Sequence, residues 1–261
     1  MTRFTVIADC GCNHGGDMMV ARRMIREAAW YGVSYAKFQL YDVEEIRGYE
    51  ERMIGEGKSS PYQAHAVPME KLFDGIREAQ LSIEQLVELR EVCVDNGVEF
   101  LCTPFINPKY VDQLEALNVE AYKIRARDSE NYALIDRALR TGKPVYISAM
   151  NLPVDHHYLW HPSIRWMLCI PRYPARLEDL ELGRLQHFSG YSNHIRDLAA
   201  PLASAVVARE HGKAEWVIEV HVTLSHEMPT LDDAVSFDFK ELGELVRLIR
   251  KVERMRVYGV L

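Results

Sequence analysis

The chain has 261 residues, of which 48% are hydrophobic and 26% are charged, and its formal net charge is −7. This balance is typical of a globular protein with one large core and excludes a fibrous or disordered chain. The acidic excess argues against a nucleic-acid-binding surface, because phosphate backbones are bound by clustered lysines and arginines. No apolar run is long enough to span a membrane, and the amino terminus lacks the apolar stretch of a secretory signal. We therefore expect a cytoplasmic protein that binds neither membranes nor nucleic acid, although a local basic pocket could still hold a small anion.

Short β-rich runs alternate with amphipathic runs along the whole chain, and no linker rich in Pro, Ser and Gly divides it. Eight of these runs are almost continuously apolar, as parallel strands are when both of their faces are buried. The pattern predicts a single (β/α)8 TIM barrel over residues 1–261. The predicted strands are Thr5 to Asp9, Tyr35 to Gln39, Glu99 to Thr103, Ala121 to Ile124, Pro144 to Ser148, Trp166 to Ile170, Phe188 to Tyr191 and Trp216 to His221.

Three helices carry clear signals at their ends or along one face. Asp17 is placed to cap a first helix, on which apolar residues recur at helical spacing from Ala21. A later helix begins with a capping-box pattern at Ser82 and ends at Gly97. The last helix runs from Lys240 to about Met255.

Two connections break the regular alternation. Residues Leu40 to Leu81 form a long loop after the second strand, and long loops at this end of a barrel often cover active sites. We therefore expect a lid there. Between Ser148 and Trp166 too few residues remain for a crossover helix of usual length, so the fifth helix should be reduced or missing.

The five cysteines have neither the even count of a disulfide framework nor the paired spacing of a zinc site. Cys10 and Cys12 form a C-x-C sequence, but no second pair accompanies it. We expect buried, reduced thiols rather than a cysteine metal site.

Polar side chains stand at the ends of the predicted strands, and in a TIM barrel the functional groups come from the carboxyl ends of the strands. Histidines, lysines, carboxylates and hydroxyls that meet in one barrel mouth suit the binding of a metal and an anion. These residues are Asp9, Lys37, Gln39, Thr103, Lys123, Asp128, Ser148, Cys169, Arg172, Ser192, His194, Glu219 and His221.

His194 and His221 differ from the other histidines because they follow adjacent strands. Their imidazoles could meet at one divalent ion and leave open positions for water and substrate oxygens, as a Lewis-acid site requires. The alternative is that each is a structural histidine.

Lys37 and Lys123 lie in otherwise apolar strands, where an unpaired ammonium group would be costly. An internal salt bridge with Asp9 or Glu219, a substrate phosphate or carboxylate, and a Schiff-base lysine all remain open.

Short motifs along the chain resemble the catalytic barrel of the N-acetylneuraminate (sialic acid) synthase family, which includes legionaminic and pseudaminic acid synthases. The resemblance spans Val6 to about Arg250, and the order and spacing of the motifs make it specific. In chain order the motifs are IADCGCNHGGD, YAKFQLY, FLCTPF, AYKI, GKPVYIS, RYP, GYSNH and IEVHVT.

The resemblance implies that phosphoenolpyruvate is condensed with an amino sugar aldehyde, giving a 2-keto sugar acid and phosphate. His194 and His221 would hold a divalent ion, Mn²⁺ by preference and otherwise Mg²⁺ or Co²⁺, that polarises the aldehyde. Asp9 and Asp128 stand where the family has glutamates and are our candidates for the base that activates water. Together with Lys123 they form the predicted catalytic set. The predicted substrate-binding residues are Lys37, Gln39, Thr103, Arg125, Arg127, Ser148, Arg172, Ser192 and Asp232.

Several positions depart from the family pattern. A hydroxyl residue and an amide residue that contact the anion in the family are here Ala126 and Pro171, and a metal-side aspartate is Asn193. The antifreeze-like domain that usually follows the barrel and contacts the acceptor is expected to be absent. The sequence leaves open whether the protein forms a homodimer.

Arg125, Arg127 and Arg172 stand where the family pattern is uncharged. Guanidinium groups bind carboxylates and phosphates in a bidentate manner, so these arginines could replace the lost anion contacts. The alternative is that they are solvated charges at the rim.

Two other functions remain open. The barrel could hold a metal-dependent aldolase, lyase or isomerase that does not use phosphoenolpyruvate, which the lost contacts favour. It could also be a non-catalytic protein that binds a sugar phosphate, although the two histidines and two lysines speak against this.

Overall fold

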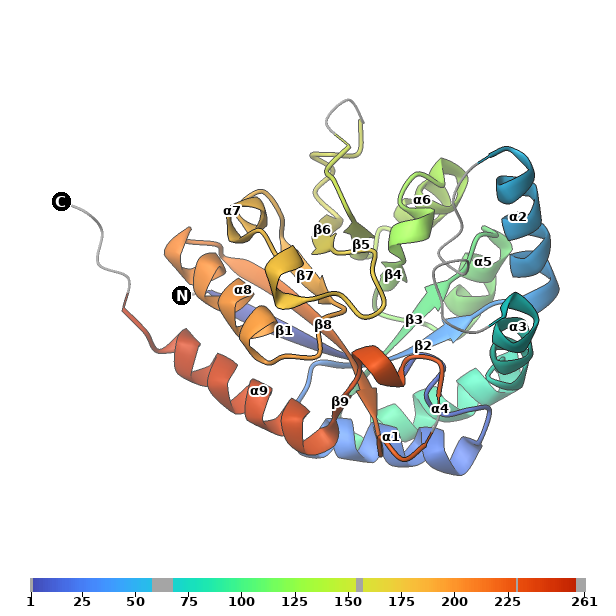
Figure 1. The fold of residues 1–261 in the computed structure, drawn as a ribbon, viewed down its shortest axis with the longest axis horizontal. Coiled ribbons are helices and arrows are strands. Elements are labelled where there is room, and N and C mark those ends of the chain that lie inside the picture. Colours follow the sequence, from blue (N-terminus) through green and yellow to red (C-terminus); the bar gives the residue numbers. More distant parts are fainter. Residues whose placement is uncertain (1, 58–67, 154–156, 229, 257–261) are drawn as a thin grey trace.

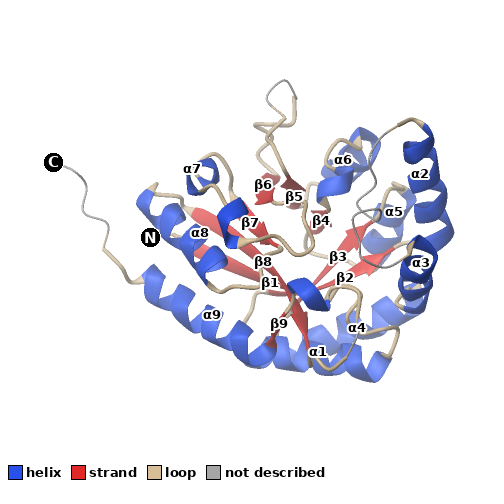
Figure 2. Cartoon of the chain, viewed as in Figure 1, coloured by secondary structure: helices blue, strands red, loops and turns tan. Residues whose placement is uncertain are grey.

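The computed structural model describes residues 2–57, 68–153, 157–228 and 230–256 as a barrel of eight parallel strands surrounded by helices (Figures 1 and 2). Strands pair in chain order, and the pairing of β1 with β8, from Arg3 with Glu215 to Asp9 with His221, closes the barrel. The predicted TIM barrel is therefore confirmed, and each predicted strand overlaps an observed one. The strands are β1 Arg3–Asp9, β2 Tyr35–Leu40, β3 Glu99–Pro104, β4 Tyr122–Ile124, β5 Val145–Ala149, β6 Ile164–Cys169, β7 Gly190–Asn193 and β8 Glu215–Thr223.

The end signals predicted for the helices are confirmed. The Asp17 carboxylate accepts hydrogen bonds from the backbone N–H groups of Met19 and Val20, and the Ser82 capping box is complete. Gly97 ends its helix at a φ of 69°, a conformation that glycine adopts without steric cost. The helices after the strands are α1 Met18–Trp30, α4 Ile83–Asn96, α5 Lys109–Ala116, α6 Tyr132–Leu139, α7 Leu182–Leu185, α8 Ala199–Glu210 and α9 Phe239–Glu253.

The connection after β2 is not the plain loop that we predicted from the sequence. It contains α2 Val43–Gly55 and α3 Met69–Glu78, whose buried apolar residues pack with Tyr41 and Phe105 in a separate hydrophobic cluster. The glycines and prolines of residues 55–68 hid this helical periodicity. The lid was expected within Leu40 to Leu81, and residues 58–67 of that stretch lie outside the described residues.

The shortened connection after β5 agrees with the prediction. In its described parts, residues 150–153 and 157–163, no helix forms between β5 and β6. Within the described chain, no helix has the length and apolar character that crossing a membrane requires. All five cysteines are free thiols. Cys12 is partly buried, and the other four are buried.

Alternation along the strands divides the barrel interior into an apolar floor and a polar mouth. The floor is a cluster of buried side chains that includes Ile7, Leu101, Met167 and Val217. Because successive side chains of a strand point to opposite faces, the residue two positions after each floor residue also points inward. These next residues include Asp9, Thr103, Cys169 and Glu219, so the fold itself places the polar groups above the floor.

Candidate active site in the barrel mouth

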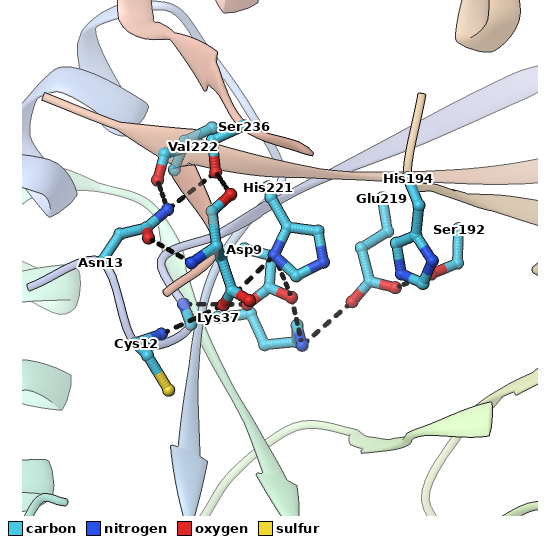
Figure 3. A network of polar contacts seen from close by, with 12 residues as sticks. Asp9, Cys12, Asn13, Lys37, Ser192, His194, Glu219, His221, Val222 and Ser236 are labelled. Carbon is cyan, nitrogen blue, oxygen red and sulfur yellow. Dashed lines mark hydrogen bonds and ion pairs between the residues drawn. The ribbon is translucent and has the colours of Figure 1, made fainter. Parts of the chain in front are cut away.

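A buried network of charges joins β1, β2, β4 and β8 in the mouth. Figure 3 shows the part of it around Asp9, Lys37 and Glu219. The Lys37 Nζ lies 2.8 Å from Asp9 Oδ2 and 3.1 Å from Glu219 Oε1. The other oxygen of Glu219 lies 3.2 Å from Lys123 Nζ and accepts a 2.6 Å hydrogen bond from the Ser192 hydroxyl. Glu219 therefore bridges the two lysines, and the internal salt bridges considered from the sequence are present.

Two hydroxyl groups complete the surroundings of the lysines. Lys123 donates a 2.7 Å hydrogen bond to the Ser148 Oγ, and Lys37 donates a 3.4 Å hydrogen bond to the Thr103 Oγ1. The predicted residues Lys37, Thr103, Lys123 and Ser148 are thus brought together in one cluster.

The electrostatics of this cluster depend on a competition between burial and opposite charge. Burial lowers the pKa of Lys37, but Asp9 and Glu219 outweigh it, so the pKa lies above its usual range. Burial raises the pKa of Glu219, yet Lys123 and Lys37 bring that pKa well below its usual range. Burial lowers the pKa of Lys123, and Glu219 offsets this only in part. Lys123 is therefore the ammonium group that deprotonates more readily.

His194 and His221 face each other beside the network, with ring centroids 5.4 Å apart and an angle of 46° between the ring planes. The Nε2 of His194 lies 2.8 Å from the Tyr173 hydroxyl, and the Nε2 of His221 lies 3.4 Å from the same oxygen. Both rings thus direct the same nitrogen toward one point in the mouth.

The other nitrogen of each ring is oriented by its own neighbour. The Nδ1 of His194 donates a hydrogen bond of 2.8 Å to the backbone carbonyl of Ile170. The Nδ1 of His221 lies 3.4 Å from Asp9 Oδ2 and 3.7 Å from Asp232 Oδ2. Burial, followed by repulsion from His221, lowers the pKa of His194 to about 3, so this imidazole is neutral at physiological pH.

These residues fit a divalent metal ion. Metal-binding histidines commonly present one ring nitrogen to the ion while the other contacts a carbonyl or carboxylate, as both rings do here. Two imidazole ligands leave further positions open for water or substrate oxygens. His194 and His221 would hold the ion through their Nε2 atoms.

The loops after β1 and β8 meet next to His221. The Asp232 carboxylate accepts a 3.4 Å hydrogen bond from the Cys12 backbone N–H, and the Cys12 Sγ lies 3.5 Å from Gln39 Oε1. Asn13 ties the same loops together through hydrogen bonds to the Val222 carbonyl and the Ser236 hydroxyl. The predicted residues Gln39 and Asp232 thus lie along the mouth that His221 enters.

Asp128 and the three arginines make contacts of their own. Asp128 is buried and pairs with Arg125. Arg127 makes two hydrogen bonds, of 3.3 and 3.1 Å, to the buried carboxylate of Glu50 in α2. Arg125 and Arg127 are therefore not solvated rim charges, whereas the side chain of Arg172 is 61% exposed beside Asp179.

Sequence reasoning missed two contributors to the mouth, Tyr173 and Asn13. It placed Glu219 in the mouth as a possible lysine partner but gave it no catalytic or binding role. Each of the three residues lies in a motif quoted from the sequence: IEVHVT, RYP and IADCGCNHGGD. Its place in that motif was the signal that could have assigned it to the site.

Comparisons with known proteins agree with this geometry. Residues 24–260 match the model of the NeuB family. A protein of Methanocaldococcus jannaschii is 31% identical over 96% of this chain and 71% of its own length. The human N-acetylneuraminate-9-phosphate synthase is 27% identical over 95% of this chain and 70% of its own length.

The fold is also that of a solved relative. A sialic acid synthetase from Leptospira borgpetersenii superposes with a TM-score of 0.83 at 25% identity, covering 100% of this chain and 87% of that protein. The chain is therefore an enzyme of the NeuB, or sialic acid synthase, family.

Proposed function

We propose that this enzyme condenses phosphoenolpyruvate with the aldehyde of an amino sugar and forms a nonulosonic-acid-like 2-keto sugar acid and phosphate. One observation carries the proposal: the Nε2 atoms of His194 and His221 converge on one point beside the paired ammonium groups of Lys37 and Lys123. The names of the relatives support the same class of reaction.

Lys37, Lys123, Ser148 and Ser192 would bind the phosphate and carboxylate groups of phosphoenolpyruvate, since ammonium and hydroxyl groups are donors suited to both. In the structure these donors contact Glu219 or one another. Glu219 would therefore hold these donor side chains in position for the anion.

The balance of charge in the mouth favours a cation as a partner of this anion. The ammonium groups of two lysines pair with the carboxylates of Asp9 and Glu219, and a third carboxylate, that of Asp232, lies beside His221. A divalent ion such as Mn²⁺ would make the mouth net positive and, when bound, would polarise the aldehyde oxygen.

The chain's own groups account for the remaining chemistry. C3 of the enol forms a bond to the aldehyde carbon, and the aldehyde oxygen takes up a proton and becomes a hydroxyl. Water adds to C2 and releases one proton, which balances the proton taken up. The bond between C2 and the phosphate oxygen then breaks, and the second proton of the added water leaves with the phosphate as C2 becomes a ketone. Asp9 would take the proton of that water, because its carboxylate lies within the mouth and contacts both Lys37 and His221. Asp128, which is held by Arg125, is the weaker candidate.

The test is release of phosphate from phosphoenolpyruvate in the presence of Mn²⁺, measured with a panel of N-acylated amino sugars and plain aldoses. We expect release that depends on the aldose and is lost in His194→Gln and His221→Gln, together with bound Mn²⁺. His187→Gln, a substitution at an exposed histidine, is the matched control. Phosphate release that is independent of every aldose would contradict a synthase.

A metal-dependent aldolase or lyase on the same site is the second candidate. Ala126 and Pro171 offer no side-chain donor at two positions where the resemblance leads us to expect an anion contact. If no phosphate is released with any aldose, cleavage of a 2-keto sugar acid to pyruvate is the assay that would support this alternative.

A further inference from the structure

We propose that the connection from β8 to α9 holds a second divalent cation, bound by His226, Asp238 and Glu241. One ligand atom from each of the three side chains lies within 4.8 Å of the others. His226 follows β8, Asp238 ends the short strand β9 Phe237–Asp238, and Glu241 lies in the first turn of α9. No residue of this set belongs to the barrel mouth described above.

The imidazole of His226 is oriented as a metal ligand would be. Its Nδ1 donates a hydrogen bond of 2.7 Å to Asp233 Oδ1, and in the neutral ring this arrangement has its lone pair on Nε2. The Nε2 atom is buried, has no hydrogen-bond partner in the described chain, and lies 3.7 Å from Glu241 Oε2. A nitrogen lone pair and a carboxylate oxygen thus face each other, and a cation between them would satisfy both.

The two carboxylates are held in place by the start of α9. Asp238 Oδ1 accepts a 2.8 Å hydrogen bond from the Glu241 N–H, and Glu241 Oε2 accepts a 2.8 Å hydrogen bond from the Asp238 N–H. Each carboxylate keeps further lone pairs for a ligand bond. The capping box therefore pre-orders two of the three ligands.

The chemistry of the set indicates which ions fit. One imidazole and two carboxylates suit Zn²⁺ or Mn²⁺, with water completing the coordination, better than the all-oxygen surroundings that Ca²⁺ and Mg²⁺ prefer. The bound ion would join His226 to α9. Asp232 lies between His226 and α9 in the sequence. The bound ion would therefore also stabilise the segment through which Asp232 contacts His221.

The test counts Zn²⁺ bound to the full chain after removal of metals and equilibrium dialysis. We expect His226→Gln to bind one equivalent less than the wild type, and the His194→Gln/His221→Gln double variant to keep the equivalent that His226 binds. Glu241→Gln should also lose it while keeping the helix cap, because glutamine serves at this position of a capping box. His187→Gln is the control and should bind as the wild type does.

The outcomes separate this site from the proposed function. If the mouth binds no metal, the wild type should bind one equivalent and His226→Gln none. Equal Zn²⁺ contents in the wild type, His226→Gln and Glu241→Gln would overturn the second site. Far-ultraviolet circular dichroism confirms that each variant is folded before its metal is counted.

Discussion

The rings of His194 and His221 face each other across 5.4 Å, and the Nε2 atoms of both approach one oxygen, the hydroxyl of Tyr173. A hydroxyl has a single proton, so it can donate to only one of the two nitrogens at a time. The two Nε2 atoms are therefore positioned for one shared ligand, and in the structure the Tyr173 hydroxyl contacts both of them.

Replacing Tyr173 by phenylalanine should destabilise the metal-free protein by about 1–3 kcal/mol, because a buried imidazole nitrogen loses its donor. In the Mn²⁺-loaded protein the cost should be smaller, since both Nε2 atoms would bind the ion. Urea unfolding with chelator and with Mn²⁺ measures the two costs. Tyr191→Phe is the matched control, because the Tyr191 hydroxyl is buried without a hydrogen-bond partner in the described chain and its loss should cost little. Equal costs for Tyr173→Phe with and without Mn²⁺ would contradict the shared site.

Glu219→Gln should lower the free energy of unfolding by about 3–5 kcal/mol, the usual cost of removing one partner from a buried ion pair. Glu219 contacts both Lys37 and Lys123, and the side chains of all three are at most 6% exposed. Glu215→Gln on the same strand removes a surface charge that pairs with Arg3 and Arg165, and should cost about 0–1 kcal/mol. Urea unfolding of the two variants makes the comparison, and similar costs would show that Glu219 does not hold the lysines together.

The barrel could be predicted from the sequence because its strands are buried on both faces and its site residues follow from the period of two along each strand. Asp9, Lys37 and His221 were predicted because they stand at the carboxyl ends of such strands. The role of Glu219 was harder to predict, because a carboxylate inside an apolar strand can be either a lysine partner or a ligand. Helices α2 and α3 were missed because glycines and prolines lie between them and because Phe105, which packs against them, comes close only in the folded barrel.

The same limit applies to the arginines after β4. Sequence position suggested anion binding by Arg127, but its carboxylate partner Glu50 lies 77 residues away and is completely buried. Such a contact depends on how the connection after β2 folds against the barrel. No local sequence pattern predicts the contact between Arg127 and Glu50.

Arg127→Ala should therefore act mainly on stability, by about 3–5 kcal/mol, because it leaves the Glu50 carboxylate buried without its partner. Arg172→Ala removes an exposed ion pair with Asp179 and should cost about 0–1 kcal/mol. Urea unfolding gives both values, and titration with phosphoenolpyruvate in parallel tests whether either arginine binds the anion. A several-fold loss of phosphoenolpyruvate affinity in Arg127→Ala at unchanged stability would support anion binding and contradict the structural role.

The stability of the metal-free protein should fall as the pH falls below about 6.5, partly because two histidines are buried in their neutral form. Burial lowers the pKa of His14 to about 4 and that of His194 to about 3, whereas both titrate near 6.5 in the unfolded chain. Between these values the unfolded state binds protons that the folded state does not, so each histidine lowers the free energy of unfolding by up to about 1.4 kcal/mol per pH unit. His14→Gln should reduce this slope by one such contribution between pH 6 and 4.5, as measured by urea unfolding at a series of pH values with chelator present. Above pH 7.5 the curves of wild type and variant should run parallel, because the imidazole is then neutral in both states. An unchanged slope in the variant would mean that His14 takes up its proton in the folded protein as readily as in the unfolded chain.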